Sequence, residues 1–261
     1  MEIWQAIVLG AVQGLCEFLP VSSSGHLLLL QRWLGVTEGG LFFDVMLHIG
    51  TLIPVFVVFF KEILGLFKKP FKKMGLLIIA TIPAGLTGVL LGDVVEGVFY
   101  RGDLLSVVLL SVTFILTATE LFFAEKVGKK SETLPLSVKS ASIMGVAQGL
   151  AIVPGLSRSG TVISAGTFAK VERSENASFA FLMSIPVILG AAVISGYKAI
   201  KGGVVIDALP LLFGVLTAAI TGYIAIKVML KVIKKANYKW FSLYLVVLAI
   251  TSIIVKLAFG I

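Results

Sequence analysis

Long apolar stretches separated by short polar connections make up most of this chain. Six of them, at about 41–60, 74–92, 104–124, 176–197, 205–227 and 240–258, are long enough to cross about 30 Å of hydrocarbon as helices. Of the 261 residues, 58% are hydrophobic and only 14% are charged, whereas soluble domains carry about 25% charged residues. The pattern predicts an all-α polytopic membrane protein with six transmembrane helices.

Basic residues are concentrated in four connections. Residues 61–73, 126–139, 170–173 and 227–239 hold 16 of the 22 Lys and Arg residues, and 93–103 is acidic instead. Cytoplasmic loops carry the excess of Lys and Arg in membrane proteins, so the net charge of +8 indicates topology, and we do not expect nucleic-acid binding.

Alternation between the two sides of the membrane works only if residues 3–35 and 136–169 each enter and leave on one side, as re-entrant helical hairpins. Each half, about 1–125 and 136–261, then has one hairpin and three spans, so the second half is inverted relative to the first. We expect residues 1–261 to form a single domain in the cell membrane, with both termini extracytoplasmic. Inverted repeats of broken helices build sites near the midplane of the membrane.

One short polar motif occurs twice, 135 residues apart. The first copy is Gln13-Gly14-Leu15 followed by Ser22-Ser23-Ser24-Gly25-His26, and the second is Gln148-Gly149-Leu150 followed by Ser157-Arg158-Ser159-Gly160-Thr161. The first copy also carries Glu17, and the second carries Arg158. Ionisable groups in a membrane are costly and are usually kept for a function. The two copies predict one polar site assembled from two halves.

Each motif contains a helix break followed by hydroxyl groups. Pro20 and Pro154 end a half-helix, and the serines that follow cap the next one. Helix N-termini bind phosphate through free N–H groups and the positive end of the helix dipole. Two N-termini and the Arg158 guanidinium favour a multiply charged phosphate group. Glu17 repels phosphate, so we expect it to bind a divalent cation or to orient His26.

Structural interpretations of these residues stay open. Serine and glycine at half-helix starts serve capping and close helix packing, His26 can be an interior histidine, and Arg158 and Glu17 can form a structural ion pair. We favour a functional site because all these groups occur together at matching positions.

Three further polar residues lie in the apolar spans. Asp44 and His48 are four residues apart and share a helix face. We expect a structural or supporting role for both, and a paired or interfacial position for Glu120.

The motifs resemble the signature segments of the undecaprenyl-diphosphate phosphatases of the bacitracin-resistance type. The resemblance rests on Gln13-x-x-x-Glu17, on residues 18–26 and 154–160, and on the further segments 44–51 and 178–186. It implies a membrane hydrolase that converts undecaprenyl diphosphate to the monophosphate and free phosphate, which recycles the lipid carrier of cell-wall glycans and confers bacitracin resistance. It also implies a site open to the extracytoplasmic face and dependence on Mg²⁺ or Ca²⁺.

The resemblance assigns roles to individual residues. It implies that Glu17, Ser23, His26 and Arg158 are catalytic. We expect the phosphate to be bound by Ser22, Ser24, Gly25, Ser157, Ser159, Gly160 and Thr161. The first acid of the family's pair is Gln13 here, so a metal ion would be held mainly by Glu17, with Gln13 as a second ligand. The family's threonine falls on Val162, one position after Thr161.

The expected mechanism is in-line attack by Ser23 on the terminal phosphate, with His26 taking the hydroxyl proton or protonating the leaving group. A water nucleophile activated by His26 is the alternative. A transporter or flippase for a phosphorylated lipid or small anion is the competing function, because inverted repeats with broken helices are transporter architecture. Binding alone does not require the Glu17, Ser23 and His26 cluster, which favours hydrolysis. A third function is hydrolysis of other lipid phosphates, and a homodimer stays open.

Overall fold

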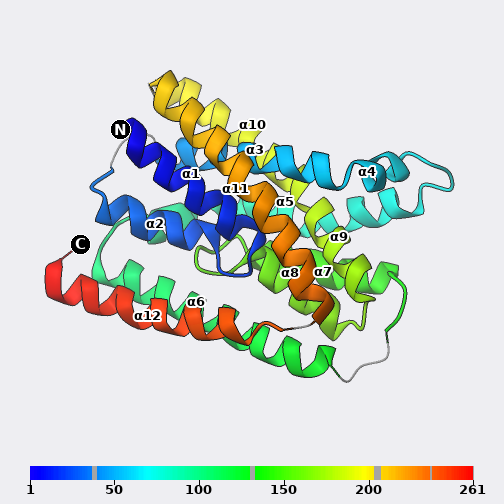
Figure 1. Cartoon of the computed structure of the whole chain (residues 1–261). Coiled ribbons are helices and arrows are strands. Elements are labelled where there is room, and N and C mark those ends of the chain that lie inside the picture. Colours follow the sequence, from blue (N-terminus) through cyan, green and yellow to red (C-terminus); the bar gives the residue numbers. More distant parts are fainter. Residues whose placement is uncertain (37–39, 130–132, 203–206, 236, 261) are drawn as a thin grey trace.

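The computed structural model describes residues 1–36, 40–129, 133–202, 207–235 and 237–260, and Figure 1 shows these residues as a bundle of helices. The helices are α1 (Ile3–Phe18), α2 (Ser23–Trp33), α3 (Gly40–Val58), α4 (Phe60–Leu66), α5 (Lys72–Phe99), α6 (Leu104–Gly128), α7 (Val138–Leu150), α8 (Arg158–Phe168), α9 (Arg173–Leu182), α10 (Ser184–Gly202), α11 (Ala208–Lys235) and α12 (Lys239–Phe259).

Six helical segments in this part of the chain are long and apolar enough to cross a membrane. They are α3, α5, α6, the pair α9 and α10, α11 and α12, which confirms the six predicted spans. The fourth span consists of two helices because Pro186 cannot donate to the carbonyl of Leu182 and its ring crowds that carbonyl. Accordingly, α9 ends at Leu182.

The outer faces of the long helices are apolar and uncovered. On α5, Val89 and Leu90 are 71% and 72% exposed, and on α10 Val193 and Ile200 are 74% and 84% exposed. Apolar surface of this extent is a contact site for lipid or protein. Together with the six long apolar helices, it makes the chain a multi-pass membrane protein.

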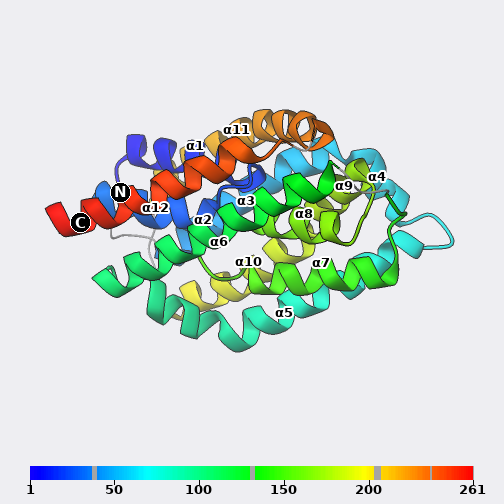
Figure 2. The ribbon, with the colours of Figure 1, turned by 90° about the horizontal axis from the view of Figure 1, so that it is seen from below.

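Two pairs of short helices carry the repeated motifs. α1 and α2 are joined by a break at residues 19–22, and α7 and α8 by a break at residues 151–157. α1 runs inward from the end that holds the N-terminus, whereas α7 runs inward from the opposite end (Figures 1 and 2). Opposite directions are what an inverted repeat requires. That the pairs enter the membrane as re-entrant hairpins stays a prediction.

The first helix of each pair packs against a long helix of the other half, α1 on α11 and α7 on α5. The motif glycines lie at these contacts. A Cβ on Gly14 would stand 2.4 Å from the Ala218 carbonyl oxygen and 2.1 Å from Thr221 Oγ1, and a Cβ on Gly149 would stand 3.2 Å from the Pro83 carbonyl oxygen. Gly14 is therefore required for the close approach of the helices, while the approach at Gly149 is looser.

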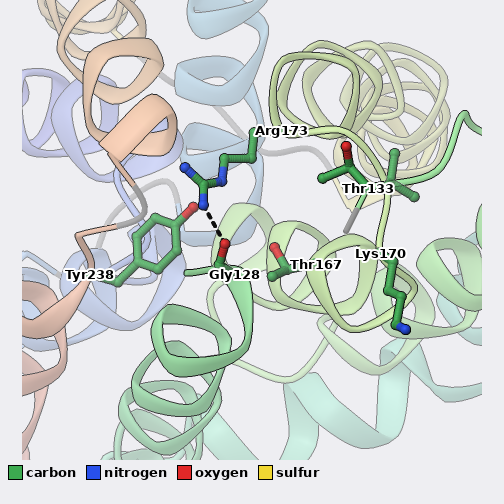
Figure 3. A pocket seen from close by; sticks show the side chains of 7 residues that line it. Gly128, Thr133, Thr167, Lys170, Arg173 and Tyr238 are labelled. Carbon is green, nitrogen blue, oxygen red and sulfur yellow. Dashed lines mark hydrogen bonds between the residues drawn. The ribbon is translucent and has the colours of Figure 1, made fainter. Parts of the chain in front are cut away.

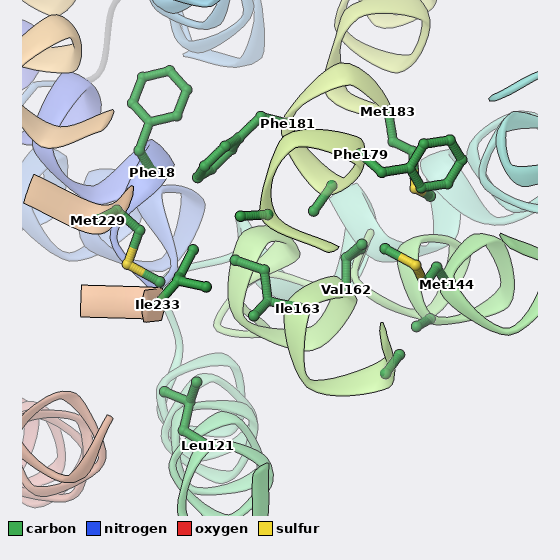
Figure 4. Packing of buried hydrophobic residues seen from close by; sticks show 14 of the residues in the cluster. Phe18, Leu121, Met144, Val162, Ile163, Phe179, Phe181, Met183, Met229 and Ile233 are labelled. Carbon is green, nitrogen blue, oxygen red and sulfur yellow. The ribbon is translucent and has the colours of Figure 1, made fainter. Parts of the chain in front are cut away.

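The buried apolar core joins both halves (Figure 4). Phe18 at the end of α1 packs edge-on against Phe181 of α9, with ring centroids 5.7 Å apart. Met229 of α11 and Ile163 of α8 are fully buried in the same cluster. This core holds the two helix breaks next to each other.

The N- and C-termini lie at one end of the molecule, and α4 and the start of α7 lie at the other (Figures 1 and 2). The basic connection 61–73 includes residues 61–66 of α4. Residues 130–132 of the basic connection 126–139 lie outside the described residues. The connections that hold most of the Lys and Arg residues were predicted on the side of the membrane opposite the termini, and α4 and the start of α7 do lie at the end opposite the termini (Figures 1 and 2). The side of the membrane that each end faces stays a prediction.

Candidate active site

The Glu17 carboxylate, in the last turn of α1, is the centre of the buried polar cluster and is only 4% exposed. Its Oε2 accepts hydrogen bonds from Gln13 Nε2 at 2.9 Å and from Ser23 Oγ at 2.7 Å. His48 Nε2 lies 3.3 Å from the same oxygen. Glu17 Oε1 accepts a hydrogen bond from Arg158 Nη2. Both carboxylate oxygens are therefore occupied by donors.

These contacts bring the two sequence motifs together. Ser23 is the first residue of α2, and Arg158 is the first residue of α8, yet both bind Glu17. A buried carboxylate is tolerated when it is paired and hydrogen-bonded. The structural ion pair between Glu17 and Arg158 is present, and it lies among the predicted catalytic groups.

Hydrogen bonds between serine side chains and backbone groups also join the two helix breaks. Gly155 N–H donates to Ser22 Oγ at 3.1 Å, and Ser159 Oγ donates to the Leu19 carbonyl oxygen at 3.2 Å. α6 holds the second break, because Thr113 Oγ1 donates to the Pro154 carbonyl oxygen at 2.7 Å. The starts of α2 and α8 are thus fixed relative to one another.

Ser22 caps the start of α2 in an unusual backbone conformation. Its φ of 66° and ψ of 93° are sparsely populated for a non-glycine residue. Its Oγ accepts from Gly25 N–H at 3.3 Å and lies 3.4 Å from Ser24 Oγ. A Cβ on Gly25 would stand 2.6 Å from the Phe114 ring, so only glycine fits there without a shift.

Ser157 caps the start of α8 with the same kind of hydrogen bond but in an ordinary extended backbone conformation. Its Oγ accepts from Gly160 N–H at 3.1 Å and lies 3.3 Å from Ser159 Oγ. A Cβ on Gly160 would stand 3.1 Å from Pro20 Cβ in the first break. The N–H groups of a helix's first turn have no partner within the helix, so both starts retain donors for an anion.

His26 is oriented by two groups other than Glu17. Its Nδ1 lies 2.7 Å from the Ser22 carbonyl oxygen, and its Nε2 lies 2.7 Å from Tyr244 Oη. Because a carbonyl only accepts, Nδ1 carries a hydrogen. The Tyr244 ring stacks on the imidazole, with centroids 5.6 Å apart. In the described part of the chain, the expected Glu17–His26 contact is thus replaced by contacts with Ser22 and Tyr244.

Thr161 lies at the position that matches His26, but its hydroxyl binds outside the Glu17 cluster. Thr161 Oγ1 donates to Glu120 Oε2 on α6 at 2.8 Å. Glu120 is therefore paired, as we expected. Val162, where the family's threonine falls, is fully buried in the core.

Two contacts of the site were missed or underrated in the sequence. His48 was assigned a structural or supporting role, and the structure places it against Glu17. Its spacing of four residues from Asp44 on an apolar span was the available signal. Tyr244 lies on α12, far beyond the second motif, and nothing in its local sequence points to His26.

The side-chain oxygens at Glu17 could hold a hard cation such as Mg²⁺ only together with oxygens of a bound phosphate. Gln13 Oε1 is buried without a hydrogen-bond partner in the described residues, so it is free to bind a cation beside the carboxylate. Those residues contain no group of three or more His, Cys, Asp or Glu side chains that could hold a metal ion. Mg²⁺ often binds through one or two carboxylates plus substrate phosphates, so Glu17 could supply the carboxylate and Gln13 Oε1 a further oxygen ligand.

A separate pocket lies between the ends of α6 and α8 and the starts of α9 and α12 (Figure 3). Arg173 donates to the Gly128 carbonyl oxygen across it. Its lining residues are Gly128, Thr133, Thr167, Lys170, Val171, Arg173 and Tyr238. None of the predicted site residues lines this pocket, so the candidate active site is the Glu17 cluster.

Known proteins resemble this chain over almost its whole length. Residues 6–251 match the family described as bacitracin resistance protein BacA. The chain belongs to this family. It is 41% identical to the undecaprenyl-diphosphatase of Carboxydothermus hydrogenoformans, over 99% of each chain.

Two further relatives show the same level of similarity. The undecaprenyl-diphosphatase of Thermodesulfovibrio yellowstonii is 41% identical over 92% of this chain and 94% of its own. That of Methanobrevibacter smithii is 41% identical over 94% of each chain. The predicted family is confirmed.

Proposed function

We propose that this chain is a membrane hydrolase that converts undecaprenyl diphosphate to undecaprenyl phosphate and inorganic phosphate. Membership of the BacA family and the names of its relatives support this activity. The observation that carries it is that a hydroxyl from one motif and a guanidinium from the other both bind Glu17. The reaction recycles the carrier lipid of the cell wall and confers resistance to bacitracin.

The diphosphate binds between the starts of α2 and α8, with the prenyl chain in the lipid. The Arg158 guanidinium has five N–H donors, so it can bind phosphate oxygens while keeping a bond to Glu17. The helix N–H groups and the hydroxyls of Ser22, Ser24, Ser157 and Ser159 supply further donors. Prepositioned donors and positive charge are the main protein contribution to phosphoryl transfer.

Ser23 is the nucleophile. Its hydroxyl already donates to Glu17, which therefore accepts the proton as the bond between Ser23 Oγ and the terminal phosphorus forms. The bond from that phosphorus to the bridging oxygen breaks, and its electron pair leaves with undecaprenyl phosphate. Water then cleaves the phosphoserine and restores the hydroxyl.

His26 is the second acid–base group. Its Nε2 is bound to Tyr244, so proton transfer by His26 at that atom requires this hydrogen bond to break. This geometry favours Glu17 over His26 as the group that takes the Ser23 proton. Direct attack by a water molecule that His26 activates is the alternative route.

A divalent cation, Mg²⁺ or Ca²⁺, would be held by Gln13 Oε1, the Glu17 carboxylate and phosphate oxygens. It would supply neutralisation of the charge on the diphosphate.

The site opens toward the extracytoplasmic side in this proposal, and both termini lie on that side. The distribution of Lys and Arg supports this orientation. A homodimer is compatible with the uncovered apolar helix faces.

Phosphate release from undecaprenyl diphosphate by the detergent-purified protein tests the activity. We expect release by the wild type and loss of release in Ser23→Ala. Thr119→Ala is the matched control, because it removes an exposed hydroxyl that bonds only within α6. Detergent solution allows no vectorial transport, so a transporter or flippase would bind the lipid and release no phosphate.

A substrate labelled in its terminal phosphate separates the two nucleophiles. Attack by Ser23 predicts a labelled phosphoserine at Ser23 after an acid quench. Attack by water predicts release of labelled phosphate with an unlabelled protein, and Ser23→Ala would then retain activity.

A further inference from the structure

His48 is held rigidly on α3 by its own helix. Its Nδ1 lies 2.7 Å from the carbonyl oxygen of Asp44, one turn earlier. Nδ1 therefore carries a hydrogen, and because a carboxylate oxygen only accepts, a hydrogen bond from Nε2 to Glu17 requires a second hydrogen on the ring. The direction of Nε2 is fixed by the backbone of α3.

Asp44 itself is anchored to α2 and to the residue that follows α5. Asp44 Oδ1 accepts from Gln31 Nε2 of α2 at 2.6 Å, and Oδ2 accepts from the hydroxyl of Tyr100, just after α5, at 3.4 Å. Asp44 is only 4% exposed. These bonds fix the part of α3 that carries His48.

The fixed Nε2 faces the oxygen of Glu17 that matters for the reaction. It lies 3.3 Å from Oε2, which also accepts the Ser23 hydroxyl, whereas Arg158 binds Oε1. The His48 side chain is 23% exposed and that of Glu17 is 3% exposed. The His48 side chain is thus more accessible than the carboxylate that it contacts.

We infer that His48 is a positioning residue that keeps Glu17 Oε2 directed at Ser23 while the substrate draws Arg158 toward the phosphate. A phosphate shares the guanidinium charge, which weakens the hold of Arg158 on Oε1. His48 is bound to α3 rather than to the substrate, so its contact with Oε2 persists through that change. This inference rests on the proposed function, because it concerns Glu17 as the proton acceptor.

Two substitutions of His48 separate positioning from packing. Asparagine retains a donor near the position of Nδ1 and does not reach Glu17, whereas glutamine places an amide N–H near the position of Nε2. We expect His48→Asn to lower kcat about 10- to 100-fold, with KM within about threefold of wild type. His48→Gln should recover a large part of kcat. Val57→Ala, on the exposed face of α3, is the matched control.

A spectroscopic measurement tests the contact without turnover. The chain has only two histidines, so ¹⁵N labelling of histidine gives a small set of ring resonances that the His48 variants assign. Glu17→Gln should move the Nε2 resonance of His48 more than its Nδ1 resonance.

The outcomes separate the inference from the proposed function. Unchanged kcat in His48→Asn, or a raised KM with unchanged kcat, would overturn the positioning role. If the wild type released no phosphate, the proposed function would fail, and an unmoved Nε2 resonance in Glu17→Gln would independently overturn the contact. If His48→Asn did not fold, His48→Gln and the resonance shift would still decide.

Discussion

Replacing Arg158 by alanine should affect both the stability of the protein and its phosphate release, and the two effects can be measured separately. In the structure, Arg158 pairs with a carboxylate that is only 4% exposed. Its loss leaves the Glu17 charge in the protein interior without its guanidinium, next to the neutral donors Gln13 and Ser23 and to His48. Removing one partner of a buried ion pair costs about 3–5 kcal/mol of stability. Arg158→Ala should therefore lower the unfolding temperature measurably.

The double variant Arg158→Ala with Glu17→Gln removes both charges. Glutamine keeps the size of the side chain and can still bond Ser23 and Gln13, so most of the lost stability should return. Phosphate release should not return, because the phosphate still lacks its guanidinium. Loss of one prepositioned hydrogen-bond donor costs about 10²- to 10³-fold in kcat, and Glu17→Gln also removes the proposed proton acceptor.

Thermal unfolding in detergent and phosphate release from the same preparations measure the two effects. Arg101→Ala, an exposed arginine at the end of α5, is the control. If the double variant were no more stable than Arg158→Ala, the guanidinium would not be compensating the Glu17 charge. If Arg158→Ala kept its turnover within about tenfold of wild type, the guanidinium would not hold the phosphate.

Two further predictions follow from single contacts, and a third follows from the distribution of Lys and Arg. Gly14→Ala should destabilise the protein more than Gly149→Ala in thermal unfolding, because the Cβ at position 14 meets backbone at 2.4 Å and that at position 149 at 3.2 Å; equal effects would contradict the asymmetry. Tyr244→Phe keeps the stacked ring but removes the hydrogen bond to His26. The ¹⁵N resonance of His26 Nε2 should therefore move while the unfolding temperature stays near that of the wild type. An unmoved resonance would exclude the bond. In a cysteine-free background, a membrane-impermeant maleimide should label Arg101→Cys in intact cells and Lys69→Cys only after lysis, and the reverse pattern would invert the topology.

The helices could be predicted from the sequence because their causes are local. A run of about 20 apolar residues spans a bilayer whatever its partners are, and the prolines at positions 20 and 154 interrupt their helices through their own chemistry. The break between α9 and α10 lies beside Pro186, whereas Pro54 and Pro83 lie inside the continuous helices α3 and α5, so a proline alone does not decide between a kink and a break. When helix continues on both sides of a break, the apolar run alone does not indicate where the break lies.

The site could be predicted in its membership but less well in its pairings. The repeat placed Glu17, Ser23 and Arg158 in matching motifs, and they do share one cluster. The partners of His26 depend on where α12 lies against α2, which no local pattern records. Thr161 shows the same limit, because its hydroxyl is claimed by Glu120 on a helix far along the chain.

The two motif copies supply one backbone design and two different chemistries. Each copy gives a helix break, a capping serine and a glycine at the third helical position, so both deliver a helix start to the centre. At matching positions, the first copy has Ser23 and the second has Arg158, and Glu17 has the apolar Ile152 as its counterpart. A symmetric chain with two carboxylates would place two serines and no guanidinium at the contact. Because Ser23 and Arg158 bind the same carboxylate from the two copies, the divergence of the copies brings together one hydroxyl and one guanidinium, the two groups to which the proposed hydrolysis assigns attack and phosphate binding.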